Sequence, residues 1–264
     1  MKYNRHFSSR LQGQYSVFSP YSPTVLRDFL RCPRYWKFRY IEGREVPAGP
    51  VLNLGITFHE FAARVSRRVL VGNIPRGDLP RGIEECAREI FREAVERGLL
   101  GPEDQAVFLE RCRNTMPMFI RLSENLWQRV EVEYYGAVDR RYAPADWRRA
   151  YLRGRVDLVL FSGDRALIVD WKMGKRPSRL SDADRLPLYI YGLLIFRRFR
   201  GVSEISAELF FAGDRGVLRI PMPRSVEGRL RGMVEDLIRK IESERDFAPR
   251  PGGHCRWCAF SGEC

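Results

Sequence analysis

Residues 154–172 read GRVDLVLFSGDRALIVDWK, which is two apolar, β-branched runs joined by the turn signal SGD. Runs of this kind around a short Gly-containing turn predict a β-hairpin. Asp157 interrupts the first run and Asp170 the second, although aspartate is poorly suited to strand interiors. Residues two apart in a strand point to the same side, so Asp170 and Lys172 are expected on one face.

The two acids of this hairpin suggest a site. Carboxylates among apolar neighbours cost free energy unless a cation compensates for them. Paired strands can bring both to one hard cation such as Mg²⁺, which prefers oxygen ligands. A lysine beside them can orient or help deprotonate water, or stabilise charge on a phosphate. The structural alternative is that Asp157 and Asp170 are surface acids at strand ends, paired with nearby arginines. The pattern favours the site.

The flanking sequence predicts helices around a sheet. Ser22 and Pro23 are typical of a helix start, and apolar residues then recur at helical spacing to residue 41. The other helical patterns cover 52–70, 80–98, 101–130, 181–199 and 225–244, and the strand patterns cover 131–138, 150–161, 165–171, 205–213 and 216–222. This order predicts an α/β or α+β fold.

Length and composition limit the class of protein. At 264 residues and 44% hydrophobic, the chain can bury one substantial core, and we expect residues 1–264 to form a single domain. A net charge of +13 indicates a polyanionic partner such as nucleic acid, although compositional bias can also make a surface basic. No run of about 18 apolar residues is present, which predicts no membrane span. The polar N-terminal residues 1–15 do not resemble a signal peptide, so a cytoplasmic location is expected.

Three cysteines, Cys255, Cys258 and Cys264, lie in the last ten residues. In a reducing compartment, clustered cysteines more often bind metal than form disulfides. Thiolates suit both zinc and iron–sulfur clusters, and three of them leave a fourth ligand to be found. Cys86 and Cys112 lie in the helical segment without metal-ligand spacing and are expected to be buried thiols.

Four motifs together resemble one nuclease family. Val156-Asp157 followed by Asp170-Trp171-Lys172 resembles the active site of the PD-(D/E)XK nucleases. The stretches LGITFHEF, RLPLYIYGL and SPTVLRDFLRCPRYWKFRY resemble the histidine-bearing helix, the Gln-x-x-x-Tyr helix and the Cys-Pro helix of its RecB-like iron–sulfur members. One departure is that Arg185 stands at the glutamine position of the second helix.

This resemblance implies a fold and a set of site residues. The fold is a restriction-endonuclease-like core, with a central mixed sheet flanked by helices, a helical insert and a 4Fe–4S cluster that joins the N- and C-terminal segments. The cluster ligands are Cys32, Cys255, Cys258 and Cys264. The Mg²⁺ or Mn²⁺ ligands are His59, Asp157, Asp170 and the carbonyl of Trp171. Lys172 stabilises charge in the transition state, and Tyr189 and Arg185 contact the substrate.

The implied function is metal-dependent hydrolysis of DNA. Relatives predict an exonuclease that prefers single strands, with some endonuclease activity, acting in CRISPR spacer acquisition (the fourth Cas family) or in DNA repair (exonuclease V and AddB-type domains). Partner proteins would be spacer-integration proteins or a helicase, because no Gly-x-x-x-x-Gly-Lys-Ser/Thr loop supplies a motor here. The aromatic residues of 35–40 either stack bases or pack against the cluster.

Two alternatives belong to other classes. One is a catalytically silent iron–sulfur subunit that binds DNA within a repair or recombination complex, against which the intact Asp157, Asp170 and Lys172 argue. The other is a transcription factor with a redox-sensing cluster, which is weaker because no helix-turn-helix signal accompanies the cysteines.

Overall fold

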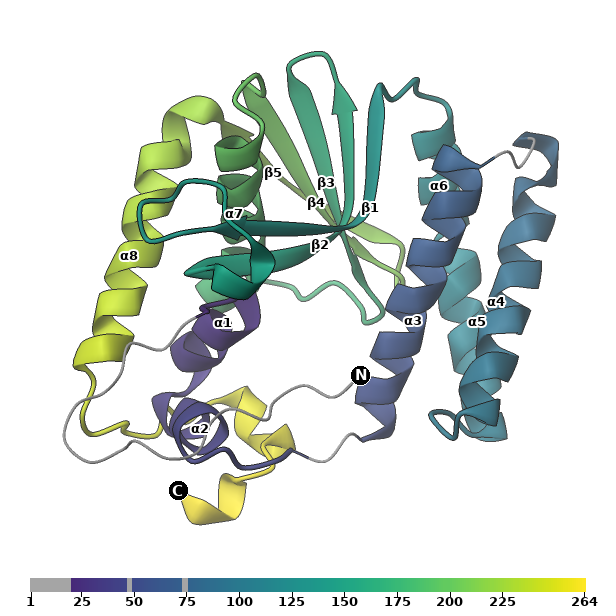
Figure 1. The fold of residues 1–264 in the computed structure, drawn as a ribbon. Coiled ribbons are helices and arrows are strands. Elements are labelled where there is room, and N and C mark those ends of the chain that lie inside the picture. The colour runs from purple at the N-terminus through teal and green to yellow at the C-terminus, as the bar shows by residue number, and fades with distance from the viewer. Residues whose placement is uncertain (1–19, 47–48, 73–75) are drawn as a thin grey trace.

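The computed structural model describes residues 20–46, 49–72 and 76–264, so the polar N-terminal stretch lies outside the described residues. Its centre is one sheet in which the strands follow chain order (Figure 1). The strands are β1 (Arg129–Val138), β2 (Leu152–Ser162), β3 (Arg165–Lys172), β4 (Glu204–Phe211) and β5 (Gly216–Pro223). Neighbours are antiparallel except β3 and β4, which are parallel and are connected through helix α7. The sheet is therefore mixed, as predicted.

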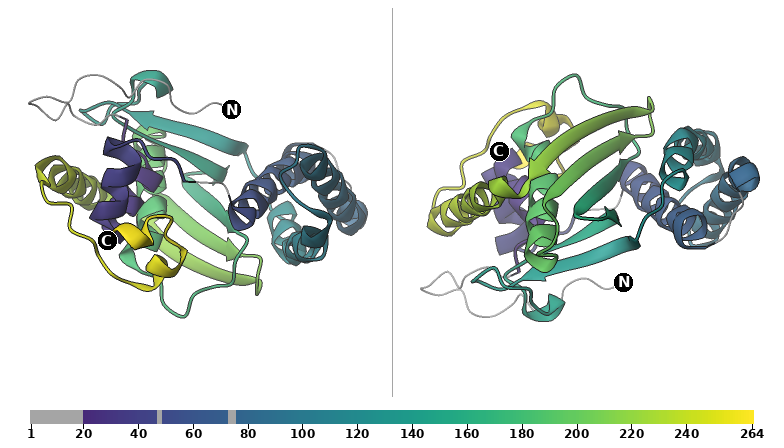
Figure 2. Two further views of the ribbon diagram at one scale, coloured as in Figure 1. Left: turned by 90° about the horizontal axis from the view of Figure 1, so that it is seen from below. Right: turned by 90° about the horizontal axis from the view of Figure 1, so that it is seen from above.

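Helices lie on both sides of this sheet. On one side are α1 (Pro23–Arg31), α2 (Pro33–Trp36), the π-helical turn η1 (Lys37–Ile41), α7 (Asp182–Arg198) and α8 (Glu227–Ser243). On the other are α3 (Pro50–Ser66), η2 (Arg67–Val71), α4 (Leu79–Glu96), α5 (Gln105–Asn114) and α6 (Met116–Ser123). Figure 2 shows this second group set apart from α1 and α8 with the sheet between them. Within this second group, α3 is the expected histidine-bearing helix, and α4–α6 lie in the segment that was predicted to be largely helical.

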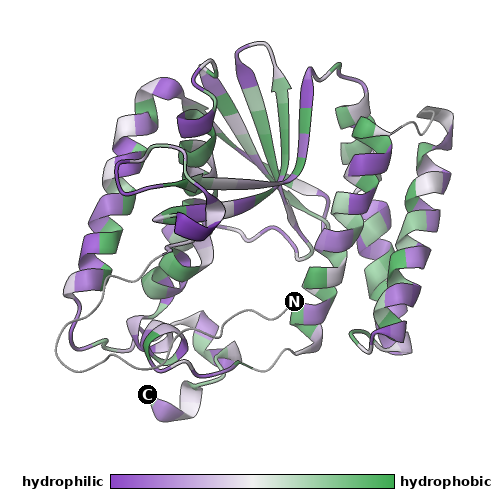
Figure 3. Ribbon diagram, in the orientation of Figure 1, coloured by the Kyte–Doolittle hydropathy of each residue, from purple (hydrophilic) through white to green (hydrophobic). Residues whose placement is uncertain are grey.

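Two apolar cores result from this arrangement. The first core lies between the sheet and α1, α7 and α8, and the second core lies between the sheet and α3–α6. Along β3 the side chains alternate, because Ile168 belongs to the first core and Val169 and Trp171 to the second. The Trp171 ring stacks on Phe119 of α6 with 4.9 Å between centroids. In Figure 3 the strands of the sheet are coloured largely as apolar.

Local chemistry accounts for the main boundaries. The β2–β3 hairpin closes between Ser162 and Arg165, and Gly163 takes the positive φ of 59° that such a tight turn requires. The expected helix from residue 23 to 41 is interrupted at Cys32, which is extended because the Pro33 ring disfavours a helical residue before it. The expected helix to residue 130 ends at Ser123 instead, and Arg129 already pairs with Phe161 in the sheet.

The β1–β2 pair bends sharply at Glu133. Val132 pairs with Leu158 and Tyr134 with Val156, and Glu133 between them has a positive φ of 55°. Val132 and Leu158 face the second core, whereas Tyr134 and Val156 face the first. In Figure 1 both strands are upright near β3 and run sideways toward their hairpin end. The bend places Asp157, opposite Glu133, where the strand pair passes from one core to the other.

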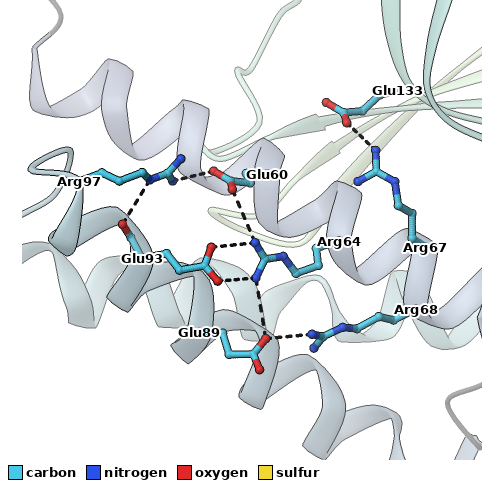
Figure 4. Close-up of polar contacts among 8 residues, drawn as sticks. All are labelled: Glu60, Arg64, Arg67, Arg68, Glu89, Glu93, Arg97 and Glu133. Atoms are coloured by element: carbon cyan, nitrogen blue, oxygen red, sulfur yellow. Dashed lines mark hydrogen bonds and ion pairs between the residues drawn. The ribbon is translucent and has the colours of Figure 1, made fainter. Parts of the chain in front are cut away.

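An ion-pair network fixes α3 against α4 and against this bend (Figure 4). Arg64 forms two parallel hydrogen bonds of 2.8 Å with the Glu93 carboxylate. Arg67 reaches Glu133 at 2.6 Å, so the end of α3 is held to the bend itself. The remaining members are Glu60, Arg68, Glu89 and Arg97. Single surface pairs contribute little, but a network with bidentate geometry gives α3 a defined position.

No helix in the described part of the chain is long and apolar enough to cross a lipid bilayer.

Glu208 is a buried carboxylate on β4, only 2% exposed. Its Oε1 lies 2.7 Å from Arg219 Nε on β5, and Arg121 of α6 also pairs with it. Because both arginines keep part of their side chains in solvent, they can rehydrate if the carboxylate is lost. The Glu208 carboxylate is buried and cannot become hydrated in this way.

We therefore predict that removing both arginines destabilises the fold more than removing the charge of Glu208. Arg121→Ala combined with Arg219→Ala strands a buried charge and should lower the free energy of unfolding by about 3–5 kcal/mol. Glu208→Gln keeps the shape and should cost less. Urea unfolding of the variants measures both, and an equal or larger loss for Glu208→Gln would contradict this account.

Candidate active site

Four residues singled out by the sequence meet where α3 approaches β2 and β3. His59 comes from α3, Asp157 from β2, and Asp170 and Lys172 from β3. The His59 Nδ1 atom lies 3.1 Å from Asp157 Oδ2, and Lys172 Nζ lies 2.5 Å from Asp170 Oδ2. The structure thus brings the four side chains together, and their catalytic and metal-binding roles remain predictions.

Strand register explains how the two acids come to lie in one site. The β2–β3 ladder ends at the pair Leu158 and Val169, so the next residue of each strand is an aspartate outside the ladder. The Asp157 Oδ2 atom accepts a hydrogen bond of 3.0 Å from the Trp171 N–H in place of a backbone carbonyl. Asp170 and Lys172 share the face of β3 opposite Trp171, whose ring is buried in the second core.

His59 and Asp157 form a charged pair. Burial lowers the pKa of His59, but the charge and hydrogen bond of Asp157 raise it more, so the net pKa is above its ordinary value. Burial raises the pKa of Asp157, yet the charge and hydrogen bond of His59 and the Trp171 N–H bring it below its ordinary value. Each partner therefore favours the ionised form of the other.

Asp170 and Lys172 form a second pair with a different balance. Burial raises the pKa of Asp170, and the charge of Asp157 adds to this, so the net pKa stays above its ordinary value despite Lys172. Burial lowers the pKa of Lys172, but Asp170 raises it more, and the ammonium is retained. The site therefore contains two carboxylates that repel each other, and each of them is paired with a cationic side chain, His59 or Lys172.

The donor set of the site suits a hard divalent cation. Two carboxylates and an imidazole are ligands that Mg²⁺ or Mn²⁺ accepts. Asp170 Oδ2 is buried and approaches Lys172 as an ion pair without the alignment of a hydrogen bond. Among the described residues, no three His, Cys, Asp or Glu side chains are arranged to hold a metal ion as they stand. The residues fit such an ion if the two ion pairs open to receive it.

Sequence reasoning missed a tyrosine and two arginines in this site. The charges of Asp170 and Asp157 act on the Tyr191 hydroxyl, and burial together with these charges raises the pKa of Tyr191 well above its ordinary value. Arg27 of α1 and Arg155 of β2 lie close enough to oppose that rise. The Tyr191 ring packs where β2 has Gly154, since a Cβ there would lie 3.2 Å from Tyr191 Cε1. No sequence signal marked these residues, because only the bend of β2 brings them to the acids.

The two predicted substrate contacts lie elsewhere on α7. Tyr189 is partly buried against the first core, and Arg185 stands one turn earlier on the same helix. Residues two apart on a helix do not share a face, so Tyr189 and Tyr191 point in different directions. The substrate roles of Tyr189 and Arg185 remain predictions.

The four predicted cluster cysteines are also within electrostatic reach of one another. Partial desolvation and the thiols of Cys32, Cys258 and Cys255 raise the pKa of Cys264. Backbone N–H groups donate to three of the sulfurs, from Arg250 to Cys32 at 3.5 Å and, within the C-terminal segment, to Cys255 and Cys258 at 3.4 Å each. All four are free thiols, and so are the buried Cys86 and Cys112.

The C-terminal segment packs on α2 and η1 through aromatic rings. Trp36 is buried and its ring is parallel to that of Phe247, with 5.9 Å between centroids. The Phe260 ring contacts Tyr35 and Phe38 with centroid distances of 5.7 and 5.1 Å. Of the two uses expected for the aromatics of residues 35–40, these contacts favour packing over base stacking.

We predict that the His59–Asp157 pair stabilises the metal-free protein in a limited pH range. Because the pKa of His59 is raised, its contribution to the free energy of unfolding is present at low pH and is lost as the pH rises through the folded pKa. Because the pKa of Asp157 is lowered, its contribution is lost at acidic pH. His59→Ala should therefore lower the free energy of unfolding more at pH of about 5.5 than at about 8.5, by up to about 1 kcal/mol. Equal losses in urea unfolding at both pH values would contradict the pairing.

Comparison with known proteins identifies the family of the chain. A family profile described as the PD-(D/E)XK nuclease superfamily matches residues 20–264. No protein of curated function matches the chain. Twenty-six solved chains match, and the crystal structure of SSO0001, at 15% identity and a TM-score of 0.37, covers 78% of this chain and 94% of its own. The chain belongs to the PD-(D/E)XK nuclease superfamily.

Proposed function

We propose that the protein is a metal-dependent DNA nuclease that hydrolyses phosphodiester bonds. Its active site would consist of His59, Asp157, Asp170 and Lys172. One observation carries the proposal. In a chain of the PD-(D/E)XK superfamily, the two acids and the lysine of that pattern lie together with a histidine from a separate helix. A silent subunit would have no need of a buried Asp170 carboxylate beside the half-buried carboxylate of Asp157, which repels it.

His59, Asp157, Asp170 and the Trp171 carbonyl are the residues that would hold Mg²⁺ or Mn²⁺. When bound, such an ion supplies a water of lowered pKa and an electrophile for the scissile phosphate. The chain contributes the placement of the ligands. The Trp171 N–H fixes Asp157, and the ion-pair network fixes the helix that carries His59.

Lys172 contributes charge. Its ammonium is retained because Asp170 raises its pKa, and its side chain is 37% exposed, so it can turn from Asp170 to an incoming phosphate. A cation at this point stabilises negative charge that develops on the phosphate oxygens in the transition state. The same ammonium can orient the attacking water.

The finer assignment is to the RecB-like iron–sulfur branch of the superfamily. Cys32, Cys255, Cys258 and Cys264 support it, because four neighbouring thiols, three of which accept backbone N–H hydrogen bonds, suit a 4Fe–4S cluster. A cluster there would join α1 to the C-terminal segment. The corresponding activity is an exonuclease that prefers single-stranded DNA, in CRISPR spacer acquisition or DNA repair, with spacer-integration proteins or a helicase as partners.

One prediction of the proposed function concerns catalysis. Asp170→Asn keeps the shape of the side chain but removes a charged metal ligand. Cleavage of single-stranded DNA with Mg²⁺ or Mn²⁺ should fall by more than about 100-fold, since partners outside the ligand shell are already worth about 10–100-fold. EDTA should abolish wild-type cleavage. The matched control is Asp164→Asn, at the exposed turn of the same hairpin, which should cleave normally. Undiminished cleavage by folded Asp170→Asn protein would refute the assigned site.

The second prediction concerns the cysteines. Protein purified without oxygen should be brown and contain iron and sulfide. Cys32→Ala should bleach it and lower the free energy of unfolding by about 2–5 kcal/mol, as loss of a cross-link that closes a long loop does. Cys86→Ala, at a buried thiol of the second core, should keep the colour. A colourless wild type with stoichiometric zinc would overturn the cluster and leave the nuclease proposal standing.

A further inference from the structure

We propose that single-stranded DNA approaches the active site along the outer face of the β1–β2 hairpin. This surface, called the hairpin face below, consists of Tyr135, Trp147, Arg153 and Arg155. The inference rests on the proposed nuclease function and adds to it the path of the strand. It begins from a tyrosine that is exposed although it lies in the middle of a paired strand.

Tyr135 is 55% exposed although it lies in the middle of a paired strand. Its ring meets the edge of Trp147, in the 3₁₀ turn η5 (Trp147–Arg149), with 4.9 Å between centroids and an interplanar angle of 82°. The Arg153 guanidinium lies 4.8 Å from the Trp147 ring centroid and donates a hydrogen bond of 3.1 Å to the Trp147 carbonyl. Arg153 thus holds Trp147 in place. The Trp147 and Tyr135 rings together form an aromatic surface.

The bend at Glu133 determines which side chains form this face. Beyond it, Gly154 and Val156 of β2 point toward α1 and α7, since Gly154 meets Leu194, Tyr191 and Pro23 and Val156 belongs to the first core. The alternate residues Arg153 and Arg155 therefore point away from that core. Arg155 pairs directly with Tyr135 across the ladder. The hairpin face carries two arginines and two aromatic rings with no helix of the first core over it.

The hairpin face leads to the catalytic acids. Arg153, Arg155 and Asp157 are alternate residues of one strand, so Arg155 and Tyr135 lie about 7 Å along the strand from Asp157. Arg155 is also close enough to influence Tyr191 beside the acids. The charge of Asp157 also acts on Arg155, so the aromatic surface and the site are neighbours along β2.

The chemistry of the hairpin face suits a single strand rather than a duplex. Unpaired bases stack on aromatic rings, whereas bases inside a duplex cannot reach them, and arginines follow the phosphates. Arg148 and Arg149 extend the positive charge, and with Asp146 they line a hollow of about 440 Å³. Asp146 and Glu133 are the acids beside these arginines, and Glu133 lies 3.3 Å from Arg155 and also pairs with Arg67. Positive groups outnumber acids along the path, as a phosphate backbone requires.

Binding without cleavage tests the inference. Wild-type protein in EDTA is titrated into a fluorescein-labelled thymidine oligonucleotide, and affinity is followed by anisotropy. Tyr135→Ala should weaken binding by about 5- to 150-fold, the loss of one stacked base, and Tyr135→Phe should restore it. Arg153→Gln and Arg155→Gln should each reduce the slope of log affinity against log salt by about 0.7. Binding of a blunt duplex should not respond to Tyr135→Ala.

Two controls separate the hairpin face from general surface effects. Leu126→Ala replaces an apolar side chain that is 94% exposed, and Arg165→Gln replaces an arginine at the far end of β3 that also stands in solvent. Both should leave single-strand affinity unchanged. The inference would be overturned if Tyr135→Ala bound the single strand as tightly as the wild type does. It would also be overturned if Tyr135→Ala lost as much affinity for the duplex as for the single strand. Failure of the wild type to cleave with Mg²⁺ or Mn²⁺ would instead refute the proposed function and leave this binding result intact.

Discussion

The site depends on the bend of the β1–β2 pair at Glu133. A straight pair would keep its alternate residues on one core throughout. Because the strands pass from one core to the other there, Asp157 lies covered by neither, yet beside Asp170. The positive φ of Glu133 is an unfavourable conformation for a side-chain-bearing residue, and its ion pairs with Arg67 and Arg155 help to hold it. Backbone geometry, the position of α3 and the proposed substrate path thus meet at one residue.

The two ends of the described chain act as a frame for this centre. The C-terminal segment packs its aromatic rings on α2 and η1, and α1 above them carries Arg27 toward Tyr191 and the acids. A cluster at the four cysteines would fix the chain ends to each other and so fix α1. In the proposed account the cluster therefore supports the active site through architecture, while hydrolysis uses His59, Asp157, Asp170 and Lys172.

The sequence predicted much of this structure because its strongest signals are local. The SGD turn, the acids within β-branched runs and the Pro-initiated helices each depend on a few neighbouring residues, and the mixed sheet with its helical insert followed from them and from the family resemblance. Tyr191, Arg27, Arg155 and Tyr135 could not be found in this way. Their importance depends on the bend and on contacts between α1, β2 and α7, which no local pattern encodes. The helix end at Ser123 was missed because Leu126, Trp127 and Val130 continue the apolar spacing, although β1 already begins at Arg129.

Direct measurement of metal binding tests the central claim, that the two acids at the end of the β2–β3 ladder form a cation site. Electron paramagnetic resonance can follow free Mn²⁺ as it is titrated into the wild type, Asp157→Asn and the exposed control Asp214→Asn. The account predicts a saturable site in the wild type and the control that is lost in Asp157→Asn, with all three proteins folded. Equal Mn²⁺ binding by Asp157→Asn and the wild type would contradict it.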